Sequence, residues 1–151
     1  MDLVESGRRL FLGSHKHALD AKGRVAVPSR FRVFLADGLV VTRGFDGCIA
    51  LYPRAAWESL SSRIHALSIT DFDVRQFRRM VFSEAIDLQL DSQGRILVPF
   101  ALRSFAGIDR EVVVIGVESS VEVWSPERWA ATSREMDAAA DDIAARLAGM
   151  L

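Results

Sequence analysis

Short apolar runs separated by glycine, proline and aspartate fill the first third of the chain, and this pattern predicts short strands and short helices. The predicted strands cover 10–19, 24–27, 39–42 and 48–52. A short helix is predicted after Pro28, because proline suits the first helical position, and it ends at Gly38. Its apolar residues Phe31, Phe34 and Leu35 fall at helical spacing. The pattern therefore predicts mixed α and β structure.

Two amphipathic helices are predicted next. The first begins after Pro53 and carries Trp57, Leu60 and Ile64 on one face. The second follows a cap at Asp71. Its inward residues would be Val74, Phe77 and Val81, and its outward residues would be Arg75, Arg78 and Arg79. An arginine cluster of that kind is typical of a solvated helix face.

The same order of elements begins again near residue 85. Strands are predicted over 85–90, 95–98, 112–117 and 121–124, with a short helix from Pro99 to Gly107 between the second and third of them. A last, alanine-rich helix follows the cap at Ser125 and Pro126 and runs toward the end of the chain. Its apolar positions are Trp129, Met136, Ile143 and Leu147. A small monomer would leave these residues and the 57–64 stretch exposed, which predicts a closed homo-oligomer.

The second run of elements reflects an internal repeat. Leu19-Asp20-Ala21-Lys22-Gly23-Arg24 returns as Leu90-Asp91-Ser92-Gln93-Gly94-Arg95, and a proline follows four residues later in each copy. The offset is 71 positions in the motif and 72 further on, as from Trp57 to Trp129. A repeat of this length is a domain-sized unit, so we predict one small fold duplicated around a shared core. The predicted parts are a disordered extension over 1–9, a first repeat with its helical connection over 10–82, and a second repeat with the C-terminal helix over 83–151.

Each copy of the motif has the composition of a tight turn between two strands. Aspartate suits the first position of a type I turn and glycine suits the fourth. We therefore predict that strands 10–19 and 24–27 form a hairpin, with Val25 and Val27 facing the core. The arginine at the end of each motif has two interpretations: it could contact a ligand, or it could only pair with the aspartate of its own turn.

The distribution of charge distinguishes the two copies. The net charge of −1 argues against a plainly basic nucleic-acid-binding protein. Basic residues nevertheless gather around the first loop: His15, Lys16, His17, Lys22, Arg24, Arg30 and Arg32. The second loop has Gln93 in place of Lys22, with Glu84, Asp87 and Asp91 in the sequence nearby. We therefore predict that the first copy contacts phosphate groups and that the second copy supports the fold.

Other kinds of chemistry have little support in the sequence. Cys48 is the only cysteine, which excludes an intramolecular disulfide and a cysteine-based zinc site. His15 and His17 share one face of a predicted strand and could bind a metal ion, but no third ligand is near them, and a solvated or phosphate-contacting face is favoured. No nucleophile–base pair and no phosphate-binding glycine loop is present, so we predict no enzymatic activity and no cofactor. No run of about 18 apolar residues predicts a membrane span.

These motifs, in this order, resemble the MraZ family of bacterial transcriptional regulators. The matching segments are Phe11-Leu12-Gly13, Asp20-Ala21-Lys22-Gly23-Arg24, Pro28 with Phe31-Arg32, Asp91 to Pro99, and Trp124-Ser125-Pro126-Glu127-Arg128-Trp129. The resemblance covers the chain from about Leu10 onward. Each repeat also resembles the DNA-binding unit of AbrB-like transition regulators.

The resemblance implies an α+β fold in which two swapped-hairpin, AbrB-like repeats form a β-barrel-like core with flanking helices. It also implies a ring of several subunits that binds G-rich direct repeats in double-stranded DNA upstream of its own operon, in the division and cell-wall gene cluster, and that usually represses it. The DNA-contacting residues implied by the resemblance are those of the first loop: Asp20, Lys22, Gly23 and Arg24.

We therefore predict a cytoplasmic, nucleoid-associated transcriptional regulator without a small-molecule substrate. Lys22 and Arg24 would approach bases in the major groove, where arginine can bond guanine, whereas the flanking basic residues would contact phosphates. The full set of candidate DNA-binding residues is Lys22, Arg24, Asp20, Gly23, Lys16, His15, Arg30, Arg32 and Arg95. The alternative is a structural or antitoxin-like protein-binding oligomer that does not bind an operator.

Overall fold

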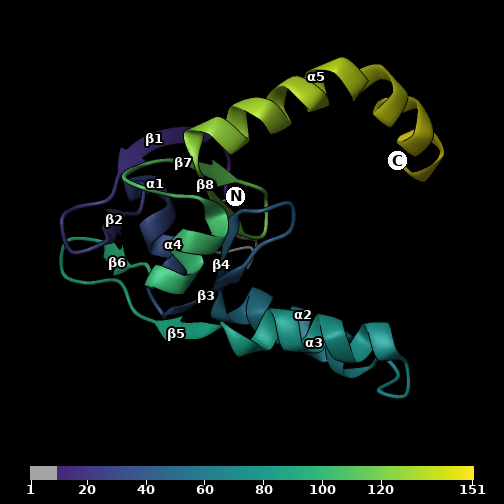
Figure 1. The fold of residues 1–151 in the computed structure, drawn as a ribbon, viewed down its shortest axis with the longest axis horizontal. Coiled ribbons are helices and arrows are strands. Elements are labelled where there is room, and N and C mark those ends of the chain that lie inside the picture. Colours follow the sequence, from purple (N-terminus) through teal and green to yellow (C-terminus); the bar gives the residue numbers. More distant parts are fainter. Residues whose placement is uncertain (1–9) are drawn as a thin grey trace, which may run out of the picture.

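The computed structural model describes residues 10–151, so the disorder predicted for residues 1–9 lies outside the described part of the chain. Its strands are β1 (Ser14–Ala18), β2 (Arg24–Ala26), β3 (Leu39–Arg43), β4 (Ile49–Pro53), β5 (Ile86–Leu88), β6 (Arg95–Leu97), β7 (Glu111–Gly116) and β8 (Val121–Trp124). Its α-helices are α1 (Ser29–Arg32), α2 (Arg54–His65), α3 (Phe72–Ser83), α4 (Phe100–Ala106) and α5 (Pro126–Leu147). Short 3₁₀ turns follow α1 at Val33–Leu35 and α5 at Ala148–Met150. The predicted α+β class is confirmed (Figure 1).

The strands form two antiparallel sheets. The larger sheet has six strands in the order β1-β7-β8-β4-β3-β5, and the smaller is a two-stranded ribbon of β2 and β6. β1 and β5 form the two edges of the larger sheet, so the sheet does not close into a barrel. The resemblance implies a β-barrel-like core, and the structure shows this core as an open sheet with a separate two-stranded ribbon.

The predicted local hairpin is wrong in its strand pairing. β1 pairs with β7 and β2 pairs with β6, so each strand finds its partner in the other repeat. The first loop is closed by local bonds, such as that from the Asp20 amide to the Arg24 carbonyl at 2.8 Å, and its Gly23 carbonyl accepts a bond from the Val98 amide of the other repeat at 3.0 Å. Beyond it, Val25 stands opposite Ile96, and both are almost fully buried. Exchange of strands lets both repeats bury these side chains together, and it agrees with the swapped arrangement implied by the resemblance.

The predicted strand 10–19 is also shorter than expected. Gly13 adopts a φ of +96°, which breaks the extended run before β1 begins at Ser14. Phe11 is fully buried and forms an isolated bridge to Glu118 instead. Gly116 leaves room for this, because a Cβ there would overlap the Phe11 and Leu12 backbone. The start of the described chain is thus fastened to the end of β7 by close backbone contact.

Residues from both repeats build one hydrophobic core. Its buried members from the two repeats include Val25, Val27, Phe31 and Leu35, and Ile96, Val98, Leu102 and Ala106. These two sets are related by the same offset as the loop motif. Phe11 packs edge-on against Phe31, with ring centroids 5.3 Å apart. The shared core explains why a repeat of about 70 residues, which would be marginal alone, is stable here.

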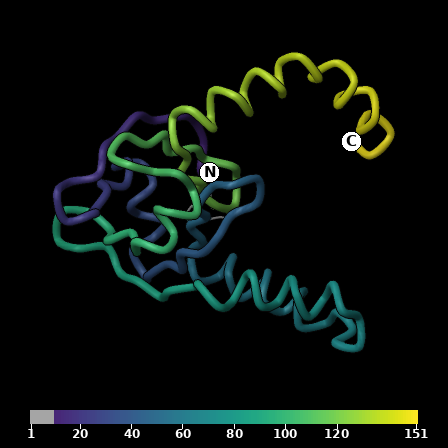
Figure 2. The backbone as a smooth tube through the Cα atoms, in the orientation of Figure 1, coloured from purple at the N-terminus to yellow at the C-terminus, as the bar shows by residue number. Residues whose placement is uncertain are grey.

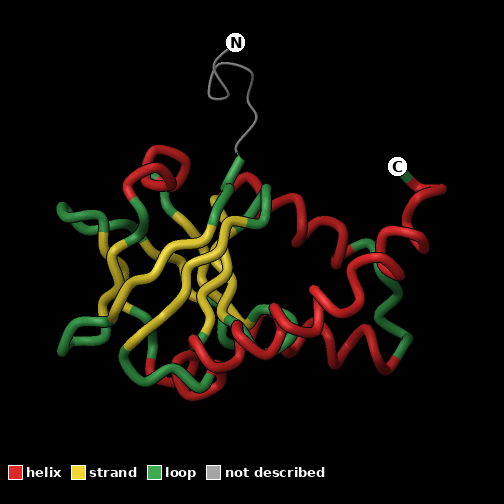
Figure 3. The backbone as a smooth tube through the Cα atoms, turned by 90° about the horizontal axis from the view of Figure 1, so that it is seen from above, coloured by secondary structure: helices red, strands yellow, loops and turns green. Residues whose placement is uncertain are grey.

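Two helical arms extend from the sheets on the side away from the β2–β6 ribbon (Figures 1 and 2). One arm is the α2–α3 pair, fastened to the sheet where Thr42 donates a 2.7 Å hydrogen bond to the Val81 carbonyl. The other is α5, in which no residue is fully buried. Figure 3 shows both arms on one side and the loops that flank the ribbon on the opposite side. The molecule therefore separates a loop end from a helical end.

Candidate nucleic-acid interface

The β2–β6 ribbon has one buried face and one solvent-facing face. In the ribbon Arg24 stands opposite Leu97, and Ala26 stands opposite Arg95. Side chains alternate between faces along a strand, so these four point away from the core while Val25 and Ile96 point into it. The outward face therefore carries one arginine from each repeat.

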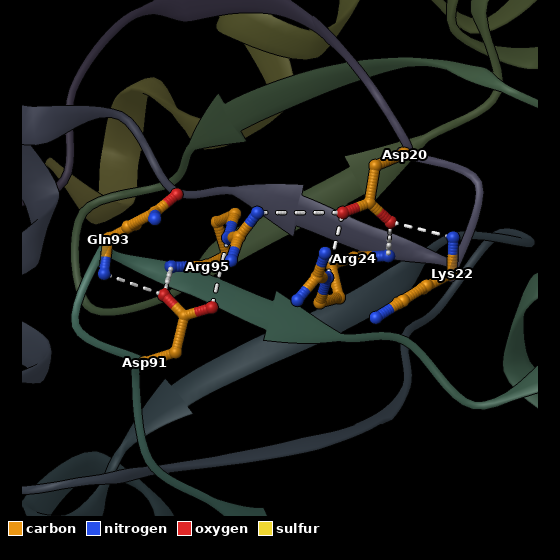
Figure 4. Close-up of polar contacts among 6 residues, drawn as sticks. All are labelled: Asp20, Lys22, Arg24, Asp91, Gln93 and Arg95. Atoms are coloured by element: carbon orange, nitrogen blue, oxygen red, sulfur yellow. Dashed lines mark hydrogen bonds and ion pairs between the residues drawn. The ribbon is translucent and has the colours of Figure 1, made fainter.

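The first loop is shaped by the carboxylate of Asp20. One of its oxygens, Oδ1, accepts hydrogen bonds from the backbone amides of Lys22 and Arg24, each at 2.9 Å. The other, Oδ2, accepts a 2.7 Å bond from Nε of Arg24 (Figure 4). The Arg24 amide, and then its side chain and the Lys22 amide, lower the pKa of Asp20, so the carboxylate stays ionised at neutral pH. Gly23 completes the turn with a φ of +82°.

The second loop repeats this geometry. The amides of Gln93 and Arg95 each donate to Oδ1 of Asp91 at 2.9 Å, and Nε of Arg95 donates to Oδ2 at 2.9 Å. The interpretation that each arginine pairs with the aspartate of its own turn is thus correct for the Nε edge of both. It does not exclude the ligand-contacting interpretation. Among the described residues, neither Nη of Arg24 has a hydrogen-bond partner, and these are the groups that could face a base.

Arg95 is more firmly held than Arg24. Its Nη1 also lies 3.7 Å from Oδ2 of Asp20, so Asp20 stands between the arginines of the two repeats (Figure 4). Arg95 therefore contacts both turn aspartates, whereas Arg24 contacts only Asp20 in the described part of the chain. This difference fits a supporting role for Arg95.

Each loop also rests on an arginine from the other repeat. Nε of Arg32 donates to the Val27 carbonyl at 2.9 Å, and its guanidinium lies where a Cβ on Gly94 would be. In the same way, Nε of Arg103 donates to the Val98 carbonyl at 3.1 Å, and its Cζ would stand 3.2 Å from a Cβ on Gly23. Arg32 thus supports the second loop and Arg103 supports the first.

The sequence analysis missed Arg103, although a signal was available. Arg103 follows Arg32 by the same 71 positions that separate the two loops. Its role becomes visible only with the exchange of strands, which places α4 of the second repeat beneath the loop of the first. Arg32, a candidate phosphate contact, is likewise held by contacts within the protein, to the Val27 carbonyl and against Gly94.

The close fit over Gly94 predicts a stability effect. Gly94→Ala should lower the free energy of unfolding by about 1–3 kcal/mol, because the residue has a φ of +74° and the new Cβ would displace the anchored Arg32. Gly23→Ala should cost less, since its Cβ would only press on Arg103. Thermal unfolding would measure both. The control is Gly149→Ala, where a Cβ would meet nothing within 4 Å; equal losses at Gly94 and Gly149 would contradict the prediction.

The remaining basic residues of the first repeat lie on the two faces of β1 and on α1. His15 and His17 share one half-buried face, as predicted, with the His15 ring edge-on to Phe31 at 5.3 Å. Burial, and then His15 and Arg32, lower the pKa of His17. Lys16 is exposed on the opposite face, in a cavity that it shares with Pro126 at the start of α5. Arg30 is exposed on α1. The structure therefore does not gather all the basic residues into one cluster.

The carboxylates expected around the second loop have other partners. Asp87 pairs with Arg54 at 2.6 Å, and Glu84 lies 3.6 Å from Arg43. Their charges are thus compensated at the helical connection, so they distinguish the loops less than the sequence suggested. The contrast between Lys22 and Gln93 remains, and both side chains are exposed.

The described residues contain no group of three or more histidine, cysteine or acidic side chains arranged to hold a metal ion. None of the helices described for residues 10–151 combines the length and the apolar character needed to cross a membrane. The ribbon face and the first loop present arginine and lysine side chains, which suit contact with anions and with the acceptor groups of bases.

The fold and the site define a class: duplicated α+β proteins whose two repeats exchange strands to present a ribbon flanked by Asp-x-x-Gly-Arg turns. Comparison with known proteins identifies the family. The family model described as "MraZ protein, putative antitoxin-like" matches the chain twice, over residues 10–80 and 81–150. The chain belongs to the MraZ family.

Individual relatives agree with this assignment. The Transcriptional regulator MraZ of Thermomicrobium roseum is 50% identical over 142 residues, which cover 94% of this chain and 100% of that protein. The protein of the same name from Roseiflexus castenholzii is 46% identical over 92% of this chain and 97% of its own length. The protein of that name from Herpetosiphon aurantiacus is 51% identical over 80% of this chain and 84% of its own length. The chain is therefore a transcription regulator.

Proposed function

We propose that this regulator binds double-stranded DNA in a sequence-specific manner through the outward face of the β2–β6 ribbon and the first loop. The observation that carries the proposal is the geometry of Arg24. Asp20 fixes the Nε edge of its guanidinium at 2.7 Å and leaves the Nη groups on an exposed ribbon face. An arginine held in this way can bond O6 and N7 of guanine without losing much conformational freedom.

The other candidates take supporting roles in this proposal. Lys22 is exposed beside Arg24 in the first loop and approaches the same groove. Lys16 and Arg30 contact phosphates and set the register of the protein on the duplex. Arg32 does the same with the part of its side chain that remains accessible beside Gly94. Gly23 shapes the loop from a buried position against Arg103, and the His15 ring packs against Phe31. Arg95 mainly holds the two turns together.

We further propose a ring of identical subunits that binds G-rich direct repeats upstream of its own operon, in the division and cell-wall gene cluster, and represses it. One short ribbon per subunit offers few base contacts, so several subunits on successive repeats would raise the affinity through effective concentration. The protein would act in the cytoplasm on the nucleoid, without catalysis and without a cofactor. The helical arms lie away from the ribbon, so they could form the subunit contacts of the ring while the ribbon faces the DNA (Figure 1).

A gel-shift experiment tests the central proposal. The full chain is titrated against the DNA upstream of its own gene and against a scrambled fragment of equal composition. Preference for the upstream fragment is the expected result. Equal binding to both fragments, or no binding to either, would favour the alternative of an antitoxin-like oligomer that binds a protein. In that alternative the exposed apolar residues of the arms would contact the protein partner.

Salt dependence gives a second prediction. Each phosphate neutralised contributes about −0.9 to the slope of log affinity against log salt, so contacts from several subunits should give a slope steeper than about −4. Lys22→Gln, which places the side chain of the second loop in the first, should make the slope shallower. Arg79→Gln on α3 should leave it unchanged, because Arg79 lies on a helical arm. A flat plot for the unmodified protein would show that the ribbon does not contact the DNA backbone.

A further inference from the structure

A large apolar side chain lies on the charged face of the ribbon. Leu97 is 54% exposed and is the ladder partner of Arg24. Directly paired residues in an antiparallel ladder have their Cβ atoms about 4.5–5.5 Å apart and share a face. The isobutyl group of Leu97 therefore stands beside the stem of Arg24, on the face that the proposed function assigns to DNA.

The two ends of the ribbon differ at this position. Leu97 corresponds to Ala26 in the first repeat, and Ala26 is paired with Arg95. The arginine next to Lys22 thus has a leucine beside it, and the arginine next to Gln93 has an alanine. Both differences make the same end of the ribbon, the end with Arg24, the better candidate for DNA contact. The leucine that flanks the first loop is supplied by the second repeat.

The fold does not account for the leucine. The inward neighbours Val25 and Ile96 make the core contact of the ribbon, and Leu97 is not among the described residues that pack on the core. A single exposed leucine is ordinary on a protein surface. Here, however, it stands directly opposite Arg24 at one end of the ribbon, on a face whose other large side chains are Arg24 and Arg95.

We propose that Leu97 contacts the C5-methyl group of a thymine adjacent to the guanine bonded by Arg24. Thymine is the one base that presents an apolar group in the major groove, and guanine presents the acceptors that suit arginine. Successive bases on one strand are about 3.4 Å apart along the axis. Two side chains about 5 Å apart can therefore reach adjacent bases. Leu97 is then a specificity-determining residue, and this inference rests on the proposed DNA-binding function.

Deoxyuridine provides the test, because it lacks only the methyl group of thymidine. The upstream fragment is prepared with thymidine and with deoxyuridine throughout, and both are titrated with the unmodified protein and with Leu97→Ala. The unmodified protein should lose at least roughly fourfold in affinity on the deoxyuridine fragment, which corresponds to about 0.8 kcal/mol per buried methyl-sized group. Leu97→Ala should bind both fragments equally, at about the weaker affinity.

A matched control separates the contact from effects of deoxyuridine on the duplex itself. Leu12→Ala truncates a leucine of similar exposure, 56%, outside the ribbon, and this variant should keep the full methyl effect. The proposal is overturned if the unmodified protein ignores the methyl group, or if Leu97→Ala remains as sensitive to it as Leu12→Ala. A Leu97→Ala protein that changes oligomer mass and keeps its methyl sensitivity would make Leu97 a subunit contact instead.

The outcome also distinguishes this inference from the function on which it rests. Failure of the unmodified protein to prefer the upstream thymidine fragment over scrambled DNA would overturn both. Preference for that fragment, with an equal methyl effect in the unmodified protein and Leu97→Ala, would overturn only the role of Leu97. Because the comparison of the two fragments with unmodified protein needs no variant, the absence of a methyl effect there would overturn the role of Leu97 even if Leu97→Ala folded poorly.

Discussion

Arg24→Ala is expected to weaken binding to the upstream fragment by at least tenfold while leaving the melting temperature nearly unchanged. Each lost guanine contact costs about 1–3 kcal/mol, and a ring that engages several repeats multiplies the loss. The effect on stability should be small, because the Arg24–Asp20 pair is partly exposed, and exposed ion pairs contribute about 0–1 kcal/mol. Titration of the fragment and thermal unfolding would measure the two quantities.

Arg95→Ala is the matched comparison for Arg24→Ala. Arg95 occupies the equivalent position but contacts two carboxylates, Asp91 at 2.9 Å and Asp20 at 3.7 Å. Its removal should therefore lower the melting temperature more than Arg24→Ala does, and it should reduce DNA affinity only in proportion to that loss. If Arg24→Ala unfolds the protein and Arg95→Ala abolishes binding by a stable oligomer, the roles of the two repeats are the reverse of those proposed.

Helix boundaries were predictable because their signals are local. Helices begin directly after Pro28, Pro53 and Pro99, each of which is the N-cap residue rather than the first helical residue expected. Ser125 caps α5 by accepting from the Arg128 amide, with Pro126 in the first turn, as predicted. Each of these signals acts within one helical turn, so the chain order alone was enough to read them.

Strand pairing was not predictable from local pattern. The turn at Asp20 and Gly23 would suit a hairpin equally well, and nothing near it in the sequence indicates that β2 pairs with β6 instead. The choice depends on burying Val25 against Ile96, a contact between residues 71 positions apart. The resemblance to known swapped-hairpin proteins supplied what the residue pattern could not.

The same non-local contacts limited the prediction of the site. The Asp–Arg turns were evident because both partners lie within five residues. The support of the first loop by Arg103, and the position of Leu97 beside Arg24, both require the exchanged ribbon. Local composition identified the Asp–Arg turns, and tertiary structure was needed to identify what surrounds them.

The apolar stripe of α5 leads to the other prediction of large effect. Trp129, Met136 and Ile143 recur every seven residues, with Leu147 one turn after Ile143, so all four lie on one side of the helix. Met136, Ile143 and Leu147 remain 36–42% exposed, and no residue of α5 is fully buried. Trp129 packs against Trp124, but the rest of the stripe stays exposed among residues 10–151, so this helix of 22 residues is expected to pack against another subunit.

Ile143→Asp combined with Leu147→Asp should therefore convert the proposed ring into smaller species, as measured by light scattering at micromolar concentration. The ribbon lies away from α5, so each subunit should keep its fold and its weak single-site DNA binding. Loss of multivalency should lower the affinity for the repeats by about 10²-fold or more. Ala145→Asp, on the opposite side of the same helix, introduces a similar charge and should leave the mass unchanged. A monomeric unmodified protein would exclude the ring. An unchanged mass for the double variant would place the subunit contact elsewhere. The next candidate would then be the α2–α3 arm, because Leu67, Ile69 and Phe72 are exposed there.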